Sequence, residues 1–591
     1  FEKKLGFDQN VKILEMASAR IRRKHVQYEY VLNDWRKLWE EALDFVTRDN
    51  IGGSTCNSTL VGTLVVRIVS FLHDARNHIP AGDVEALVAE AHDKLEDITN
   101  MQNTEGLLLL INCLPTAYAN YDAAVPVWVK LWTRISHNSM WDCLWLTLLC
   151  RARKHTRTYD WSQLSSLFCI KARELVGLPS IHGKKPMGSR YPMTMPHMFA
   201  SLVPSNVDAQ KVGLNKLAKL MYSLTLVSKT PVMVDASILT PPKLYGVSAE
   251  DTPRVPGFNA AAAIRPGALE VVLFVQTMRT FLYPSNAGAW TPLLAYYLTT
   301  LVSEMARHVG RNLSHTLFDV DGATQRVQGM QIFEAPVHIV TIRFLSGYLA
   351  STMMECLYGK NNMMTDFASK CLKNLCGMDP TLGLLVVPFL LGALDPQAVN
   401  QSHQAPIAMR ALSDSLMSLL YPCPVVLQYL PELLRLSLPG VDANDAIKSC
   451  ATLQMYSNLF EWLQVKKVYI APQSTSYPPA VLSMLSSEDE LDSDYKALFA
   501  SLVDEKKVQP HYDKLAVVVE DWAVDFLNKI FEVVESQDEL KKDQKSPAIN
   551  GYINNCIEHL FQACSWDKAS GYALRTRLEN KIIDYYRMST P

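Results

Sequence analysis

The stretch LPGVDANDAIKSC, Leu438 to Cys450, places several oxygen-bearing side chains close together, so calcium binding is the first chemistry to test. A calcium loop of the EF-hand type needs oxygen ligands at alternate positions, a glycine at the sixth position and a glutamate at the twelfth. Counted from Asp442, Asn444 fits the third position. The fifth, sixth and twelfth positions hold apolar residues: Ala446, Ile447 and Leu453. The sequence therefore excludes this type of calcium loop.

The same stretch is typical of the start of a helix. Pro439 and Gly440 form a turn, and Asp442 or Asn444 is predicted to accept a hydrogen bond from a free N–H group of the first helical turn. Apolar residues then recur at every fourth position, as on the buried side of a helix: Ile447, Ala451, Met455, Leu459 and Leu463. We expect a helix with a packed face and no metal.

Phosphate chemistry has one candidate, the stretch GLPSIHGKK from Gly177 to Lys185. Its glycine spacing is one residue longer than that of a phosphate-binding loop, and no serine or threonine follows Lys184 to hold magnesium. The zinc-protease, serine-hydrolase and dinucleotide-binding motifs are absent from the sequence. An enzyme is the weaker class of function, and we predict no catalytic residue.

Two basic runs are candidates for binding a polyanion: RIRRKH, beginning at Arg20, and RARKHTR, beginning at Arg151. Arginine and lysine clustered on a helix can bind phosphates or an acidic partner. The candidate residues are Arg20, Arg22, Arg23, Lys24, Arg151, Arg153 and Lys154. The alternative, which we favour, is a solvated face or the capping of helix C-termini, because no aromatic residues are interleaved with these charges.

Composition restricts the remaining classes of function. Hydrophobic residues make up 48% of the 591 residues, which is ample for a folded core, and the formal net charge is −2. A nearly neutral chain has no overall field that favours nucleic acid or an anionic membrane, so neither is expected as a direct partner. The 12 cysteines show no zinc-ligand spacing, and we expect most to be reduced core residues. The tryptophans near Trp128 to Trp145 recur at helical spacing, which favours core packing.

The elements that would position any site are predicted to be helices. Runs of two to four helical turns alternate with short breaks, as in NHIPAGDVEALVAEAHDKLED, where Pro80 and Gly82 precede Asp83 as a predicted cap. The longest apolar run, Gly383 to Leu394, is interrupted by Pro388 and is too short to span a bilayer. The alternation of helical runs with short breaks predicts an all-α protein, an α-solenoid of HEAT-like repeats.

Two breaks divide the chain. Prolines crowd between Leu178 and Pro266, where we expect long loops around one helix near Leu214 to Leu226. A second break carries the acidic run SSEDELDSD. The predicted organisation is helical repeats over 1–178, a proline-rich insertion over 179–268, helical repeats over 269–470, an acidic and proline-rich linker over 471–494, and further helical repeats over 495–591.

Two unusual turns point to a family. FLYPSNAGAW, Phe281 to Trp290, and LPGVDANDAIKSC resemble turn motifs of the large single-chain HEAT-repeat proteasome activators, the bleomycin-sensitivity family. Further matches, in the order and spacing of that family, are CLPTAY at Cys113 to Tyr118, VKLWTRI at Val129 to Ile135 and YDWSQLSSLF at Tyr159 to Phe168. The chain resembles the N-terminal portion of these activators, and the similarity covers most of it from about Trp35.

The resemblance implies a curved solenoid that forms the wall of a dome on the core proteasome. It implies contact with the outer α-ring subunits, opening or regulation of the substrate gate without ATP, and residence in the nucleus and cytoplasm. No cofactor is required, although some members bind inositol polyphosphates. Acetylated histones and the remaining C-terminal portion of the activator are the other implied partners.

One departure from the family concerns its C-terminal tail, in which a penultimate tyrosine inserts between ring subunits. Here Tyr585 and Tyr586 are followed by five further residues, so the pair is not such a tail, and we expect the chain to be part of a longer activator. The competing interpretation is another HEAT-repeat scaffold such as a nuclear transport receptor. Co-purification distinguishes the two, since the first predicts proteasome subunits and the second a small GTPase or cargo.

Overall fold

The computed structural model describes residues 6–22, 31–49, 58–97, 99–178, 199, 201–226, 230–235, 238–239, 261–283, 288–318, 339–396, 403–420, 424–463, 497, 500–539, 547–565 and 572–589. Contacts between residues divide the chain into two compact units. The first is Phe1–Leu224, and the second consists of Thr225–Met330 and Glu334–Pro591. We describe each unit by itself.

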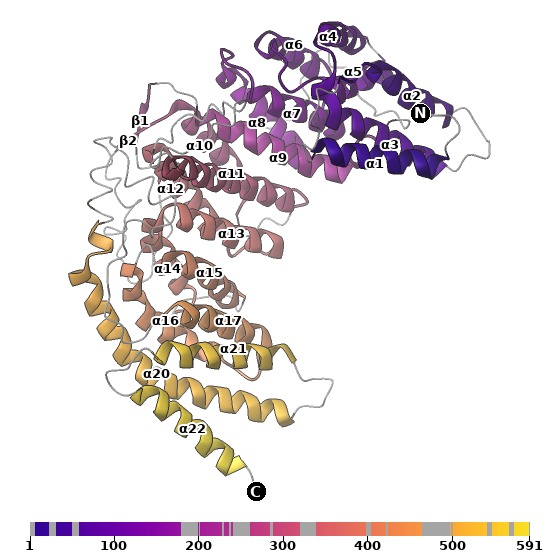
Figure 1. Cartoon of the computed structure of the whole chain (residues 1–591). Helices are drawn as coiled ribbons and strands as arrows, with labels where there is room; N and C mark the ends of the chain where they lie inside the picture. Colours follow the sequence, from indigo (N-terminus) through magenta and orange to yellow (C-terminus); the bar gives the residue numbers. More distant parts are fainter. Residues whose placement is uncertain are drawn as a thin grey trace. The chain divides into compact units, whose positions relative to one another are not determined.

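The first unit consists of paired helices. They are α1 (Phe7–Arg22), α2 (Trp35–Asp49), α3 (Ser58–Ala75), α4 (Ala81–Glu96), α5 (Asn100–Cys113), α6 (Tyr121–Arg134), α7 (Ser139–Arg153), α8 (Ser165–Val176) and α9 (Asn206–Leu224), with the short 3₁₀ helices η1 (Arg76–His78) and η2 (Trp161–Leu164). Helices α1, α3, α5, α7 and α9 pack side by side in one row, and α2, α4, α6 and α8 each cover the next helix of that row (Figure 1).

The second unit repeats this arrangement. Its helices are α10 (Pro266–Met278), α11 (Thr291–Phe318), α12 (Ile339–Cys356), α13 (Asn362–Met378), α14 (Gly383–Gly392), α15 (Gln404–Leu419), α16 (Leu430–Ser437), α17 (Ala446–Trp462), α20 (Glu505–Glu539), α21 (Pro547–Cys564) and α22 (Ala573–Ser589). Short 3₁₀ helices join them: η5 (Arg279–Phe281), η7 (Pro380–Leu382), η8 (Pro424–Tyr429) and η9 (Leu438–Gly440). Helices α11, α13, α15, α17 and α21 pack in one row, with α10, α12, α14, α16 and α20 beside it (Figure 1).

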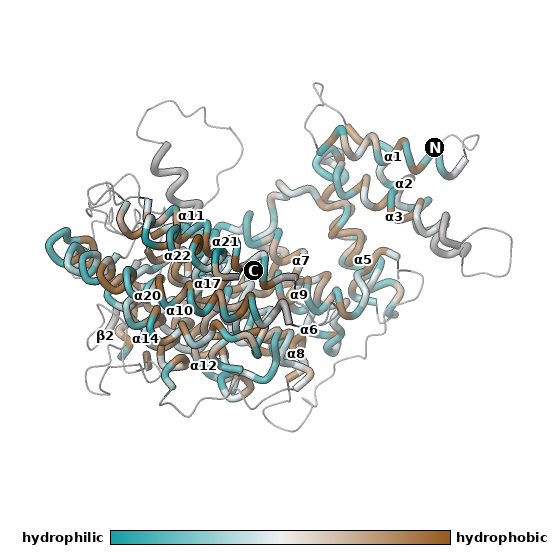
Figure 2. The backbone as a smooth tube through the Cα atoms, turned by 90° about the horizontal axis from the view of Figure 1, so that it is seen from below, coloured by the Kyte–Doolittle hydropathy of each residue, from teal (hydrophilic) through white to brown (hydrophobic). Residues whose placement is uncertain are grey.

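Paired helices stacked in two rows are the architecture of a HEAT-like solenoid, so the predicted all-α solenoid fold is confirmed. Figure 2 shows apolar and polar residues alternating along single helices, as expected where each helix buries one face. Trp128, Trp132, Trp141 and Trp145 are fully buried, which confirms their predicted place in the core. Most of the described cysteines are buried free thiols, also as predicted. In the described part of the chain, no helix combines the length and the apolarity that a membrane crossing needs.

The proline-rich insertion holds a feature that the sequence did not predict. Strands β1 (Val232–Asp235) and β2 (Ala261–Ile264) pair antiparallel, with Val232 opposite Ile264. The predicted helix is present as α9 but begins earlier, at Asn206, because the Ser205 side chain accepts a hydrogen bond from the Asp208 N–H at 3.3 Å. The predicted linker over 471–494 lies outside the described residues, as does most of the insertion.

Both predicted helix caps need correction. Helix α17 is capped by Asp445, whose side chain accepts from the Lys448 N–H at 2.9 Å. Asp442 instead accepts from the Asn444 N–H at 2.9 Å and closes the turn before the helix, because η9 keeps the chain out of helical register until Asp445. In α4 the cap position belongs to Pro80. Asp83 lies in the first turn and accepts from the Trp35 indole N–H at 2.9 Å.

The predicted apolar face of α17 is correct except at its first residue. Ala451, Met455, Leu459 and Leu463 are buried, whereas the Ile447 side chain is 66% exposed. Ile447 is the second residue of α17, ahead of the packed part of the helix. The buried face of α17 therefore begins one turn later than the sequence pattern predicts.

The corrected cap gives a testable prediction. Replacing Asp445 with alanine is expected to destabilise α17 by about 1 kcal/mol, because the amide of Lys448 loses its acceptor. The exposed Asn444→Ala control should change the stability by less than about 0.5 kcal/mol. Hydrogen exchange of the first turn of α17 measures the stability change in both variants. Added calcium should alter neither exchange rate. Equal effects of the two substitutions would contradict the assignment of Asp445 as the cap.

Candidate functional site

The first basic run lies at the end of α1. Arg20 and Arg22 occupy its last turn with exposed side chains, and Arg22 Nε lies 3.5 Å from Asp74 Oδ2. Arg23 and Lys24 lie outside the described residues. Arg20 and Arg22 are therefore open to an anionic ligand in solution, and polyanion binding by this run stays a prediction.

Arg151 has a different environment from its neighbours in the sequence. Its guanidinium donates to the carbonyl oxygens of Ile111 at 2.7 Å and Leu114 at 3.2 Å, which are unpaired acceptors at the C-terminal end of α5. Burial lowers the pKa of Arg151 to about 10, and the nearby Arg76 charge acts in the same direction. Arg151 therefore joins α7 to α5, which is the capping role that we weighed against phosphate binding.

The other two candidate residues of the second basic run, Arg153 and Lys154, have different environments. Arg153 Nε donates to Ser223 Oγ at 3.2 Å, and its guanidinium lies 6.0 Å from the centre of the Trp161 ring. Lys154 follows the last turn of α7 and is exposed. The structure does not bring Arg151, Arg153 and Lys154 together as one basic surface, so Lys154 is the member that a dissolved polyanion would reach first.

A buried ionic cluster that the sequence analysis did not predict joins α6, α7 and α8. Asp142 of α7 is 0% exposed, and its carboxylate accepts from the Trp132 indole N–H at 2.6 Å and contacts His137 Nδ1 at 2.5 Å. Lys171 of α8 is 1% exposed, and its ammonium lies 3.0 Å from Asp142 Oδ1 and 2.9 Å from Glu174 Oε2. The available signal was a charged residue inside each of two largely apolar helical runs, Asp142 in MWDCLWL and Lys171 in FCIKARELV.

The chemistry of this cluster is that of a satisfied buried ion pair. Burial opposes the ionisation of Asp142, but the hydrogen bond from His137 and the charge of Lys171 outweigh it and hold the pKa of this carboxyl below its ordinary value. Ligand atoms of His137, Asp142 and Glu174 lie within 4.8 Å of one another, a spacing that suits a metal ion. The Lys171 ammonium, however, already takes the position between the carboxylates that a cation would fill, so we assign the cluster a structural role.

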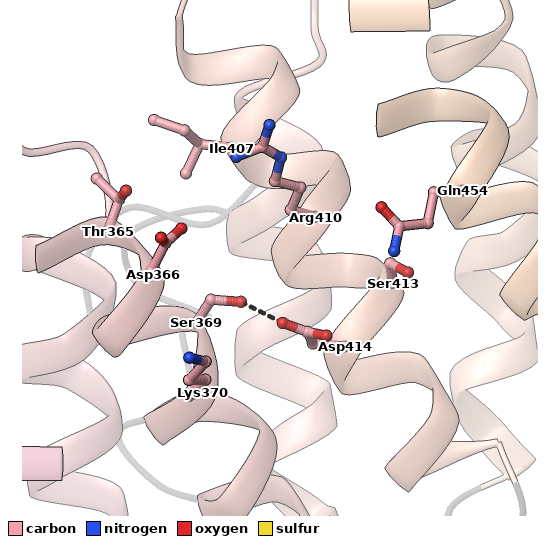
Figure 3. Close-up of a pocket in the computed structure, with 9 residues that line it drawn as sticks. All are labelled: Thr365, Asp366, Ser369, Lys370, Ile407, Arg410, Ser413, Asp414 and Gln454. Atoms are coloured by element: carbon pink, nitrogen blue, oxygen red, sulfur yellow. Dashed lines mark hydrogen bonds between the residues drawn. The ribbon is translucent and has the colours of Figure 1, made fainter. Parts of the chain in front are cut away.

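A polar groove with a cavity volume of about 200 Å³ lies across α13, α15 and α17 in the second unit (Figure 3). Successive helices of one row supply its walls: Thr365, Asp366, Ser369 and Lys370 from α13, Ile407, Arg410, Ser413 and Asp414 from α15, and Gln454 from α17. Because residues four apart lie on one face of a helix, α13 presents Asp366 with Lys370, and α15 presents Arg410 with Asp414. Each of these two helices thus contributes one acidic and one basic side chain.

The floor of the groove is fixed by hydrogen bonds, whereas its rim is open. Ser369 Oγ donates to Asp414 Oδ2 at 2.9 Å, the bond drawn in Figure 3, and Asn458 Nδ2 donates to Ser413 Oγ at 2.6 Å. At the rim, Asp366, Lys370 and Arg410 are exposed. Within the described parts of the chain, none of these three side chains makes an ion pair or a hydrogen bond. The groove therefore offers charges of both signs to a ligand.

Comparison with protein families identifies a match in the later part of the chain. Residues 272–579 match the family model described as "Proteasome activator complex subunit 4, mid HEAT repeats region". The chain is also 22% identical, over 421 residues, to a protein of Arabidopsis thaliana called proteasome activator subunit 4. That alignment covers 67% of this chain and 20% of the plant protein, so the chain spans about a fifth of the length of this relative.

Comparison with solved structures finds proteins of low similarity. An engineered protein is 12% identical with a TM-score of 0.23, and the match covers 82% of this chain and 99% of that one. A mutant of Kap121p is 11% identical with a TM-score of 0.24, over 94% of this chain and 55% of that one. Kap121p bound to Nup53p is likewise 11% identical, with a TM-score of 0.22 over 95% of this chain and 56% of that one. At such scores these structures carry no argument about function.

Proposed function

This chain belongs to the family of proteasome activator complex subunit 4, and from this premise we propose that it forms part of an ATP-independent activator of the core proteasome. In this proposal the activator caps the core particle, binds its outer α ring and opens or regulates the substrate gate. The observation that carries the proposal is the family match over residues 272–579, more than half of the chain. The match to the plant activator subunit supports it.

The arrangement of the helices suits a structural scaffold better than a catalytic site. Two rows of helices present long, continuous surfaces, and each helix is held by its neighbours in the row. The charged groups of the Asp142 cluster and the guanidinium of Arg151 are committed to joining helices. We propose that the chain acts as a scaffold, and that the remaining part of the activator and the α-ring subunits are its partners.

The proposal is tested on the native complex. We expect an antibody against this chain to isolate a particle that contains core proteasome subunits. Addition of that activator to purified core proteasome should raise the turnover of a fluorogenic peptide, equally with and without ATP, because the family is expected to open the gate by binding alone. The control is core proteasome with antibody eluate from which the chain has been depleted.

Two results would overturn this function. The first is a particle that contains a small GTPase or transport cargo and no proteasome subunits, which would favour a transport scaffold. The second is a complex with the proteasome whose addition leaves peptide turnover unchanged at saturating concentration. In that case the protein would bind the core particle without acting on its gate.

A further inference from the structure

We propose that the groove across α13, α15 and α17 binds an extended polypeptide segment that carries side chains of both charges. We call it the mixed-charge groove, defined by Asp366, Ser369, Lys370, Arg410, Asp414 and Gln454. This proposal concerns the chain itself and is tested without the proteasome, so it stands or falls independently of the proposed function.

The spacing of the three helices that line the groove favours an extended chain. Neighbouring packed helices lie about 8–10 Å apart, so the path from α13 over α15 to α17 measures about 16–20 Å. An extended strand rises about 3.3 Å per residue, so about six residues cover that path. A segment running across the three helices would meet a new helix at about every third residue. A helical ligand rises only about 1.5 Å per residue and would need about twice as many residues to cover the same distance. We therefore favour an extended segment as the ligand.

The charged side chains of the groove restrict which ligand it can bind. A polyanion would gain from Lys370 and Arg410 but would be repelled by Asp366 and Asp414, and a polycation would meet the opposite conflict. A polypeptide that places a basic side chain at Asp366 and an acidic one at Arg410 satisfies both helices. Figure 3 shows that these two groups come from facing helices, with Asp366 on α13 and Arg410 on α15. Charge complementarity therefore favours a segment of mixed charge over nucleic acid or polyphosphate.

The uncharged groups suit the backbone of the same segment. An extended polypeptide exposes unpaired N–H and C=O groups along its length, and these need partners. Gln454 supplies an exposed amide, which can donate and accept, and Asp414 has acceptor sites beyond the one that Ser369 uses. Since the hydrogen bonds between Ser369 and Asp414 and between Asn458 and Ser413 already fix the floor, these floor side chains lose little conformational freedom when a ligand binds.

The experiment measures the binding of a fluorescent, unstructured peptide to the full 591-residue chain by anisotropy. The probe has about a dozen residues, with lysine and glutamate alternating at about every third position. We expect saturable binding that weakens with added salt, because the contacts are exposed charges. The substitutions Arg410→Glu and Asp366→Lys should each weaken binding by about five- to tenfold, and Lys506→Glu, an exposed change on α20, should leave it unchanged.

Comparison peptides and cross-linking complete the test. An all-lysine and an all-glutamate peptide of the same length should bind more weakly than the mixed probe. A photoreactive group on the mixed peptide should form cross-links in α13, α15 and α17. The proposal is overturned if the two groove variants bind as well as the parent chain, if a single-sign peptide binds best, or if the cross-links fall elsewhere. Circular dichroism confirms that each variant keeps its helical content, so a loss of binding reports on the groove.

Discussion

Lys171→Met is expected to loosen the packing of α6, α7 and α8 by about 3–5 kcal/mol, the cost of removing one partner from a buried ion pair. Asp142 is fully buried, and without Lys171 its carboxylate keeps the donors Trp132 and His137 but loses the opposing charge. Because the pKa of Asp142 is lowered in the folded chain, this stabilisation is present above the ordinary carboxyl pKa of about 4. It is lost as the pH falls through the lowered pKa of Asp142.

Hydrogen exchange of peptides from α6 to α8 measures this effect, because a chain of two units need not unfold in one step. Exchange at neutral pH should accelerate by roughly a hundredfold to a few thousandfold. The matched control is Arg435→Met, which removes an exposed partner of Glu432 and should change exchange in α16 by less than about fivefold. An unchanged exchange rate in Lys171→Met would show that Asp142 does not depend on this lysine.

A double substitution separates charge from volume. Combining Asp142→Leu with Lys171→Met removes both charges, and replacing a buried pair with apolar residues is often close to neutral. Recovery should be incomplete, because the Trp132 indole N–H then loses its acceptor at a cost of about 1–3 kcal/mol. A double variant as unstable as the single one would show that packing, and not the unpaired charge, sets the cost.

Trp522→Ala is expected to destabilise the second unit by a similar amount, about 3–5 kcal/mol. Trp522 lies on α20 and is 5% exposed. Its ring stacks on Phe526 at a centroid distance of 5.0 Å, meets Tyr456 of α17 edge to face at 4.9 Å, and its indole N–H donates to the Leu434 carbonyl of α16 at 3.1 Å. One side chain thus links three helices, so its loss leaves a cavity and removes one of the two hydrogen bonds to the Leu434 carbonyl, which also accepts from the Leu438 N–H.

The conservative and surface variants define this effect. Trp522→Phe keeps an aromatic ring beside Phe526 but loses the hydrogen bond to Leu434, so we expect a cost of about 1–2 kcal/mol. Val517→Ala, on the same helix and 68% exposed, should stay within about 0.5 kcal/mol of the parent chain. Hydrogen exchange in α16, α17 and α20 measures the loss of stability in each of the three variants. A cost for Trp522→Ala no larger than that for Val517→Ala would contradict the packing role.

The sequence predicted those features that depend on short-range patterns. Apolar spacing identified the helices and the buried side of α17, because a helix must turn one stripe toward its neighbour. It erred at Asp442 and Asp83, where the choice among nearby acidic residues depends on the path of the preceding turn. The indole of Trp35, distant in sequence, takes the carboxylate of Asp83 that was predicted to cap α4.

The sites depended on contacts between distant residues and were mostly missed. Asp142 and Lys171 are 29 residues apart, and only the packing of α7 against its neighbours brings their charges together. The mixed-charge groove draws on α13, α15 and α17, whose register across the row cannot be read from any one helix. The basic run at Arg151 shows the converse, since its neighbouring charges point to different partners once the helices are packed.

The row arrangement of helices also shapes how each unit folds. In the first unit α3 packs against α1, α2 and α5, and α5 against α3, α4 and α7, so most contacts join helices close in the sequence. Chains with such local contacts pay little loop-closure entropy before the contacts form, and they fold quickly for their size. Structure can start at any helix pair and grow along the row, one pair at a time. A nascent chain emerging from the ribosome could therefore begin to order its first pairs before the later ones have been synthesised.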